Sequence, residues 1–247
     1  MKNKIKWLCT FVLLSFAMLF SCVLLGKLGM ISAEDKETVA VAADGEEITV
    51  VIDAGHGGED GGCVAPDGTL EKDLNLSLAT DVYEILRAAG INTSLTRKDD
   101  TMLYSKYGDL DDYTGVKKTY DLKNRVRMAK ESECELFVSI HMNKFSDPRY
   151  SGLQVYYSPN DSDSINAAMR IRKYAEEYLD PENEREIKKA GSNIYVLHRS
   201  QMPAVLVECG FLSNENDLEL LKDRSYRKKL ALCIAAAVAD SLANFQT

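Results

Sequence analysis

Short apolar runs rich in β-branched residues alternate with longer amphipathic segments along most of this chain. Each apolar run is short enough for one buried strand, and the runs cover 48–53, 91–96, 136–140, 153–157 and 203–208. Helical spacing of apolar residues is found over 73–89, 121–130, 165–178 and 226–245, with a further helix beginning at 213–216. Strands that alternate with helices predict an α/β fold, a single-domain sandwich with a central twisted sheet, mostly parallel or mixed, flanked by helices.

The N-terminal segment departs from this alternation and indicates export. Lys2, Lys4 and Lys6 precede an almost unbroken apolar run from Trp7 to Leu25, which is long enough to span a bilayer. The basic end should stay in the cytoplasm and place the remainder outside. We expect a signal peptide or membrane anchor over 1–33, a polar linker over 34–47 and a folded domain over 48–247.

Charge and cysteine content narrow the function classes. The chain carries a net charge of −8, and its first 33 residues hold four lysines and no acid, so the domain itself is more acidic still. Such a surface excludes nucleic acid as a partner. Cys63, Cys134, Cys209 and Cys233 are scattered and form no CxxC pair, so we interpret them as small core residues rather than as disulfides or a cysteine metal site.

Two of the three histidines stand where α/β proteins place their sites. His56, in the glycine-rich loop 54–58, and His141 each follow a predicted buried strand directly. The carboxyl ends of strands form the ligand-binding edge of an open α/β sheet. The pair therefore predicts a metal site, and the absence of a Gly-Lys-Ser/Thr sequence after the loop argues against a phosphate loop.

A third ligand is needed, because catalytic zinc sites use three protein ligands and leave one position open. Glu71, at the start of the first long helix, can point back into the glycine-rich loop, although an acid there also complements the helix dipole. Glu59 and Asp60 compete with it. Two histidines and a carboxylate also describe the iron site of oxygenases, so the residues alone leave the ligand and the metal open.

Glu208 is the acid with the clearest chemical meaning. It ends the apolar run that begins at Ala204, and a buried carboxylate is costly unless it is paired or used. Beside a metal it would serve as a general base for water, and the alternative is a buried ion pair. Asn143, two residues after His141, either orients the substrate or forms a turn.

Four segments of the chain resemble the zinc-dependent N-acetylmuramoyl-L-alanine amidases over about residues 48–245. These are Val51-Ile52-Asp53-Ala54-Gly55-His56-Gly57-Gly58, Leu70-Glu71-Lys72-Asp73-Leu74-Asn75-Leu76, Ser139-Ile140-His141-Met142-Asn143 and the run from Pro203 to Asn214 that contains Val207-Glu208-Cys209-Gly210-Phe211. The resemblance implies that His56, Glu71 and His141 bind Zn²⁺ and that Glu208 is catalytic. Ala54 and Cys209 depart from the commoner residues of that family, as does His198, for which a groove-lining role is one interpretation.

The resemblance further implies the substrate and the setting. We expect hydrolysis of the amide bond between N-acetylmuramic acid and L-alanine in peptidoglycan, outside the cytoplasmic membrane. The polar segment 98–119 is typical of spore-cortex amidases, which act before muramic-lactam formation. It should be an exposed excursion that contacts glycan or an activating protein partner, with Tyr104, Tyr107 and Tyr113 available to stack on sugars. The alternatives are a zinc-dependent cell-wall peptidase or deacetylase and a non-catalytic wall-binding protein.

Overall fold

The computed structural model describes residues 49–107 and 117–245, all within the compact unit Glu46–Thr247. The expected signal or anchor segment, the linker and Tyr113 lie outside these residues. The strands are β1 (Val50–Ala54), β2 (Thr93–Leu95), β3 (Leu136–Asn143), β4 (Gln154–Tyr157), β5 (Lys188–Lys189) and β6 (Ala204–Phe211). The helices are α2 (Glu71–Ala88), α3 (Lys117–Glu131), α4 (Asp163–Tyr178), α5 (Tyr195–Arg199), α6 (Glu215–Lys222) and α7 (Arg224–Leu242).

The six strands form one mixed sheet in the order β2-β1-β3-β6-β4-β5. All neighbouring pairs are parallel except β4 and β6, which are antiparallel. The carboxyl ends of β1, β3 and β6 therefore meet at one edge, and the register places His141 of β3 directly opposite Glu208 of β6. The predicted α/β sandwich with a mixed central sheet is confirmed.

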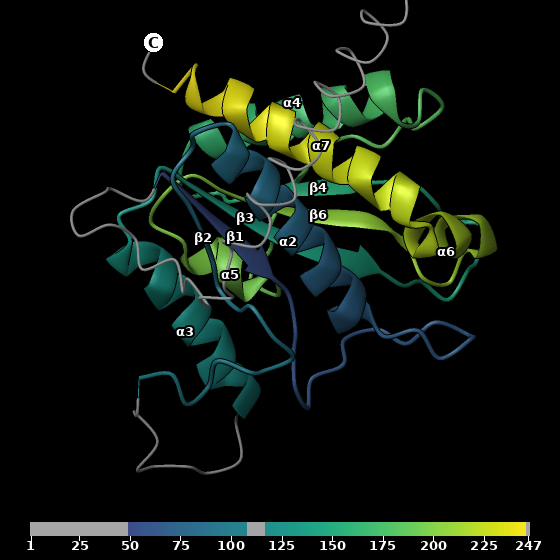
Figure 1. Ribbon diagram of the computed structural model, residues 1–247, viewed down its shortest axis with the longest axis horizontal. Coiled ribbons are helices and arrows are strands. Elements are labelled where there is room, and N and C mark those ends of the chain that lie inside the picture. Colours follow the sequence, from purple (N-terminus) through teal and green to yellow (C-terminus); the bar gives the residue numbers. More distant parts are fainter. Residues whose placement is uncertain (1–48, 108–116, 246–247) are drawn as a thin grey trace, which may run out of the picture. The chain divides into compact units, whose positions relative to one another are not determined.

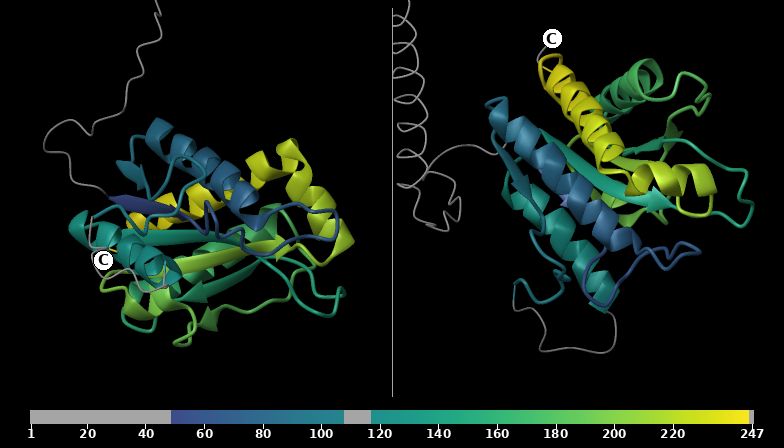
Figure 2. Two further views of the ribbon diagram at one scale, coloured as in Figure 1. Left: turned by 90° about the horizontal axis from the view of Figure 1, so that it is seen from below. Right: turned by 45° about the vertical axis from the view of Figure 1, so that its right-hand side comes forward.

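Strand residues alternate between two differently covered faces. On β1, Val50 and Ile52 pack with the layer of α2, α4 and α7, whereas Val51 packs with α3 and α5. In Figure 1, α2 and α7 lie side by side across the sheet, and Figure 2 shows the sheet between its helical layers. The apolar face of each strand thus finds a helix to cover it, as the alternation of the sequence requires.

The structure differs from the sequence-based expectation in the segment 98–119. Leu103 is only 7% exposed, and α3 begins at Lys117, so this segment is in part buried and in part helical. Tertiary contacts override its polar composition, because the backbone N–H of Leu103 donates to the buried Asp121 carboxylate. β5 and α5 were not predicted, since two and five residues are too few to show periodicity.

Two further expectations concern membranes and cysteines. None of the helices in the part of the chain that the structure describes is long and apolar enough to cross a bilayer. Cys63, Cys134, Cys209 and Cys233 are free, and all but Cys63 are buried. Their interpretation as core residues holds for those three.

Candidate metal centre and active site

The loop after β1 places His56 in an unusual backbone conformation. His56 has φ 61°, in the left-handed region that L-residues rarely adopt. Its carbonyl oxygen accepts a hydrogen bond of 2.6 Å from Nη2 of Arg125, which comes from α3. Nε of Arg97, just after β2, donates to the carbonyl of Ala54, and its Nη2 donates to that of Gly55. Two buried guanidinium groups therefore hold the loop that carries the first histidine.

Two glycines allow the loop to approach the other site residues. A Cβ atom at Gly55 would lie 2.3 Å from Nε2 of His141, and one at Gly62 would lie 2.5 Å from Oε2 of Glu71. Real Cβ atoms do not approach neighbours this closely, so any side chain at these positions would displace a site residue. The absence of a side chain at Gly55 and Gly62 is thus part of the geometry of the site.

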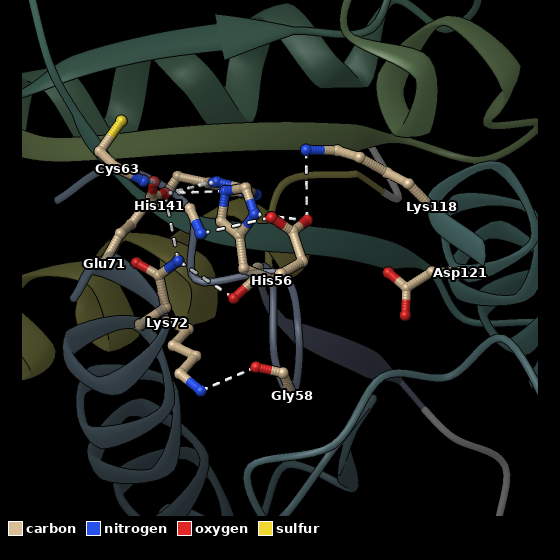
Figure 3. Close-up of polar contacts among 12 residues, drawn as sticks. His56, Gly58, Cys63, Glu71, Lys72, Lys118, Asp121 and His141 are labelled. Carbon is tan, nitrogen blue, oxygen red and sulfur yellow. Dashed lines mark hydrogen bonds and ion pairs between the residues drawn. The ribbon is translucent and has the colours of Figure 1, made fainter. Parts of the chain in front are cut away.

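Glu71 stands at the first position of α2 and points into the space between the two histidines (Figure 3). Its Oε1 lies 3.2 Å from Nε2 of His56 and 2.9 Å from Nδ1 of His141. Oε2 accepts the backbone N–H of Cys63 at 2.7 Å, which fixes the carboxylate. The metal-ligating atoms of these three residues lie within 4.8 Å of one another, and two imidazoles with a carboxylate form a donor set that suits zinc.

The protonation of the site follows from its charges. Burial lowers the pKa of His56, but hydrogen bonds to Asp60 and Glu71 outweigh it and raise that pKa to about 9. Burial raises the pKa of Glu71, yet hydrogen bonds with His141 and His56 bring it far below its usual range. In this arrangement a proton on the imidazole neutralises the carboxylate, and a metal cation would take the place of that proton.

Glu208 lies beside the three residues without joining them. It occupies the β6 position opposite His141, and its Oε2 atom is buried without a hydrogen-bond partner in the described part of the protein. Burial raises the pKa of Glu208 to about 7, with the charge on His141 opposing and the charge on Glu71 reinforcing this shift. A carboxyl group whose pKa is near neutral can accept and return a proton at physiological pH.

A cavity of about 200 Å³ opens next to these groups. Its walls come from the glycine-rich loop, the start of α3, the segment around α5 and the strand residue Glu208. Lys118 stands on its rim, with Nζ 3.2 Å from the Asp60 carboxylate. The site therefore offers a substrate space with both histidines and the candidate base exposed to it.

A buried ionic network underlies the floor of this cavity. Arg125 Nη1 contacts Asp53 Oδ1 at 2.6 Å, and its Nε contacts Asp121 at 2.7 Å. Thr96 and Ser139 also donate to the Asp53 carboxylate. Burial raises the pKa of Asp53, but the guanidinium charge and these two hydrogen bonds outweigh it, so that the pKa lies below 3.8.

The other residues considered from sequence take different places. Asp60 contacts Nδ1 of His56 at 2.8 Å on the side away from Glu71, and Glu59 pairs with Lys117 at the surface. Asn143 accepts the backbone N–H of Lys144 within the turn after β3, and its role in orienting substrate stays a prediction. His198 lies on α5, and its buried Nδ1 has no hydrogen-bond partner among the described residues.

Sequence reasoning missed the two arginines that hold the loop. Arg97 and Arg125 are 3% and 1% exposed, and each donates to the carbonyl of Ala54, the last residue of β1. In Arg125 the available signal was its position on the predicted helix 121–130, four residues after Asp121, which makes an i,i+4 pair on one face. No feature of the sequence around Arg97 predicted that its side chain is buried.

Comparison with known proteins agrees with the geometry. Residues 50–240 match the family described as N-acetylmuramoyl-L-alanine amidase. A germination-specific N-acetylmuramoyl-L-alanine amidase from Bacillus subtilis is 32% identical over 95% of this chain and 93% of its own length. The CwlD amidase of Clostridioides difficile, solved in complex with the GerS lipoprotein, is 37% identical with a TM-score of 0.73, covering 79% of this chain and 98% of that one. An amidase of Nostoc punctiforme is 32% identical with a TM-score of 0.69, covering 81% and 99%. The chain belongs to the N-acetylmuramoyl-L-alanine amidase family.

Proposed function

We propose that this protein is a zinc-dependent N-acetylmuramoyl-L-alanine amidase that cleaves the bond between the lactyl carbonyl of muramic acid and the nitrogen of L-alanine. His56, Glu71 and His141 hold the metal, and Glu208 is the general base and acid. The observation that carries the proposal is the convergence of three ligand atoms within 4.8 Å, beside a buried carboxylate oxygen that has no protein partner in the described chain.

The chain's own residues divide the reaction between them. When bound, zinc supplies a Lewis acid that makes water more acidic and stabilises negative charge on a carbonyl oxygen. Glu208 accepts a proton from the attacking water as the new carbon–oxygen bond forms. It then returns that proton to the alanine nitrogen as the carbon–nitrogen bond breaks, so the products are a lactyl carboxylic acid and a free amine. Asp60 orients His56 through Nδ1, which leaves Nε2 directed at Glu71 and the metal position.

Glu208→Gln separates the base from the ligands, because the amide has the same shape and cannot take the proton. We expect turnover to fall by about a hundredfold or more while zinc content stays near one ion per chain. His56→Ala and His141→Ala should lose both zinc and activity. Elemental analysis that finds no zinc affinity in the unmodified protein would contradict the metal assignment, and a loss of zinc in Glu208→Gln would make Glu208 a ligand. Iron-dependent oxygen consumption would indicate an oxygenase instead of a hydrolase.

The cleaved bond is identified by its products. Mass spectrometry of peptidoglycan digested by the 34–247 fragment with zinc should show released stem peptides that begin with a free alanine amine, and muramic acid without a peptide. New carboxylates inside the stem would indicate a peptidase, and new glucosamine amines would indicate a deacetylase. Intact peptidoglycan after digestion with zinc-loaded protein would favour a non-catalytic wall-binding role.

The setting that we propose is the spore cortex, outside the cytoplasmic membrane and with a protein partner. A relative named as germination-specific and a structural neighbour solved with a lipoprotein support this choice. Lys2, Lys4 and Lys6 before the apolar run support export, as a signal peptide or an anchor. A reporter fused after residue 45 should be active only when exported, and the lipoprotein fraction of the producing cells should raise turnover. Cytoplasmic reporter activity would overturn the topology.

A further inference from the structure

The loop between β3 and β4 carries an exposed group of aromatic rings at the same sheet edge as the active site. Phe145 is 50% and Tyr150 46% exposed. Their rings meet edge to face at 4.7 Å, and the Tyr150 ring lies 6.3 Å from that of Phe211, the last residue of β6. The guanidinium of Arg185 lies 4.7 Å from the Phe211 ring. We call Phe145, Tyr150, Phe211 and Arg185 the aromatic platform.

The platform is held rigidly rather than displayed on a loose loop. The backbone N–H of Phe145 donates to Ser213, and the Asn214 side chain donates to the carbonyl of Pro148. The Asp217 carboxylate accepts the N–H groups of both Gly152 and Phe211, and thereby ties the end of this loop to β6. Side chains positioned in this way bind with little loss of conformational entropy, which is the property of a prepared binding surface.

The platform is close to the reacting groups along the chain. Phe145 follows His141 by four residues and Phe211 follows Glu208 by three, so at the rise of an extended chain they lie within about 13 Å and 10 Å of those residues. The β3–β4 loop is also tied to the segment between β1 and α2, since Nζ of Lys144 donates to the carbonyl of Val64. A polymer whose scissile bond sits at the metal position is therefore within reach of this surface.

The polar rim completes a surface suited to sugars. A shallow cavity of about 340 Å³ lies beside the Tyr150 ring and is lined by Asp147, Arg149, Tyr150, Ser151 and Arg185. Aromatic faces cover the C–H face of a pyranose, while charged and hydroxyl groups at the rim bind its hydroxyls. Exposed aromatic rings that adjoin one another and have a polar rim are the kind of surface that binding sites use.

Two of the tyrosines in the polar segment 98–119 also lie against cations. Lys117 Nζ lies 5.3 Å from the centre of the Tyr104 ring, and the guanidinium of Arg127 lies 3.9 Å from that of Tyr107. One face of each ring is therefore covered by a cation, and the guanidinium of Arg185 likewise lies 5.6 Å from the centre of the Tyr150 ring. Even so, Tyr150 is 46% and Phe145 50% exposed. Sugar stacking by Tyr104, Tyr107 and Tyr113 stays a prediction, and the β3–β4 loop adds a second aromatic surface.

We infer that the aromatic platform is a glycan subsite that binds pyranose rings of the peptidoglycan strand next to the muramic acid whose amide is cut. This inference rests on the proposed function and names the part of its substrate that the platform recognises. Phe145 and Tyr150 provide the stacking surfaces, and Arg185 with Arg149 provides the polar contacts at the rim. In this arrangement the stem peptide would bind in the cavity between α3 and α5.

The binding test uses the zinc-loaded Glu208→Gln protein and peptide-free glycan strands of alternating N-acetylglucosamine and N-acetylmuramic acid, so that it needs no turnover. Replacing both Phe145 and Tyr150 by Ser should weaken glycan binding by about tenfold or more in calorimetry. Tyr150→Phe should keep the affinity, because the ring remains. Tyr178→Ser on α4 is the matched control, since Tyr178 is 64% exposed and belongs to another surface. Unchanged glycan affinity in the double variant would overturn the inference.

The kinetic test uses the otherwise unmodified enzyme with and without the two serine substitutions. With polymeric peptidoglycan as substrate, the two serine substitutions should raise KM. With a muramoyl peptide that has one sugar they should leave KM unchanged, and they should change neither the zinc content nor the melting temperature. Equal losses on both substrates would mean that the platform contacts the peptide or supports the fold. Losses seen only when a partner protein is present would make it a protein surface. If the protein cleaved neither substrate but bound glycan through the platform, the proposed amidase activity would be refuted and the glycan subsite would stand.

Discussion

The two faces of the sheet are packed by different kinds of side chain. The face under α2, α4 and α7 is a continuous apolar core that includes Leu78, Ile171 and Ile234. The face under α3 and α5 has a small apolar cluster and, beside it, the buried pairing of Arg125 with Asp53 and Asp121. Apolar contacts are non-directional, whereas buried ion pairs and hydrogen bonds specify position. We interpret the first face as stabilising the fold without setting the geometry of the candidate metal centre, and the second as the frame that sets this geometry.

The largest effect is expected from Arg125→Met, which leaves two carboxylates buried without their partner. The free energy of unfolding should fall by about 3–5 kcal/mol, measured by urea denaturation. Zinc affinity in the folded fraction should also fall, because the carbonyl of His56 loses its donor. Arg127→Met is the matched control: Arg127 is exposed on the same helix and pairs with Glu131, so the cost should be about 0.5 kcal/mol.

The pH dependence of the loss of stability in Arg125→Met tests whether the buried charge of Asp53 causes it. In the unmodified protein, the pKa of Asp53 lies below 3.8, so its contribution to stability is present above that value and is lost as the pH falls through the lower, folded-state pKa. Without Arg125, burial dominates and raises the pKa of Asp53, so the penalty of Arg125→Met should shrink on acidification. An equal penalty at pH 5 and pH 8, measured with the zinc-free proteins, would mean that charge is not its cause.

The apolar face is tested by Leu78→Ala in the middle of α2. Leu78 is fully buried, and its truncation should cost about 3 kcal/mol through lost burial and a remaining cavity. Zinc affinity, measured under conditions where the variant is folded, should be unchanged. If Leu78→Ala weakened zinc binding as much as Arg125→Met does, the division of labour between the two faces would be wrong.

The smallest effect in this series is expected from Asp60→Asn, which changes the contact of that carboxylate with the outer side of His56 and its ion pair with Lys118. We expect zinc affinity to fall about tenfold, or about 1.4 kcal/mol, because the neutral amide orients the imidazole less strongly. Competition with a chromogenic chelator measures it. Glu59→Gln is the control, since Glu59 pairs with Lys117 at the surface and should leave the affinity as it is. A similar loss in both variants would indicate a general effect of negative charge.

The sequence was sufficient to predict the strands and helices in which apolar residues recur at a regular spacing. The buried strands and long helices follow from apolar spacing, and their order places His56, His141 and Glu208 at one sheet edge. Glu71 could not be chosen over Glu59 and Asp60 from spacing, because all three stand within fifteen residues after His56 in the sequence. The resemblance to a family favoured Glu71, and the structure brings its carboxylate between the two histidines.

The parts that could not be predicted depend on contacts between distant segments. Arg97 reaches the carbonyls of Ala54 and Gly55 across more than forty residues of sequence, with no local pattern to announce it. Polar composition made the segment 98–119 read as solvent-exposed, whereas Leu103 is buried through its bond to Asp121. The aromatic platform likewise joins a loop to the end of β6, and its four residues come from three separate stretches of sequence.

The close approach of Gly55 and Gly62 to the metal centre has an evolutionary consequence. A single base change in either codon introduces a side chain into space that His141 or Glu71 already occupies. Such a descendant would still carry the proposed ligands and the proposed base in its sequence, and we nevertheless expect it to be inactive. An intact set of ligands is therefore a weaker sign of a working enzyme than an intact set of ligands together with these two glycines, and pseudoenzymes in this family are expected to include chains that only the glycines reveal.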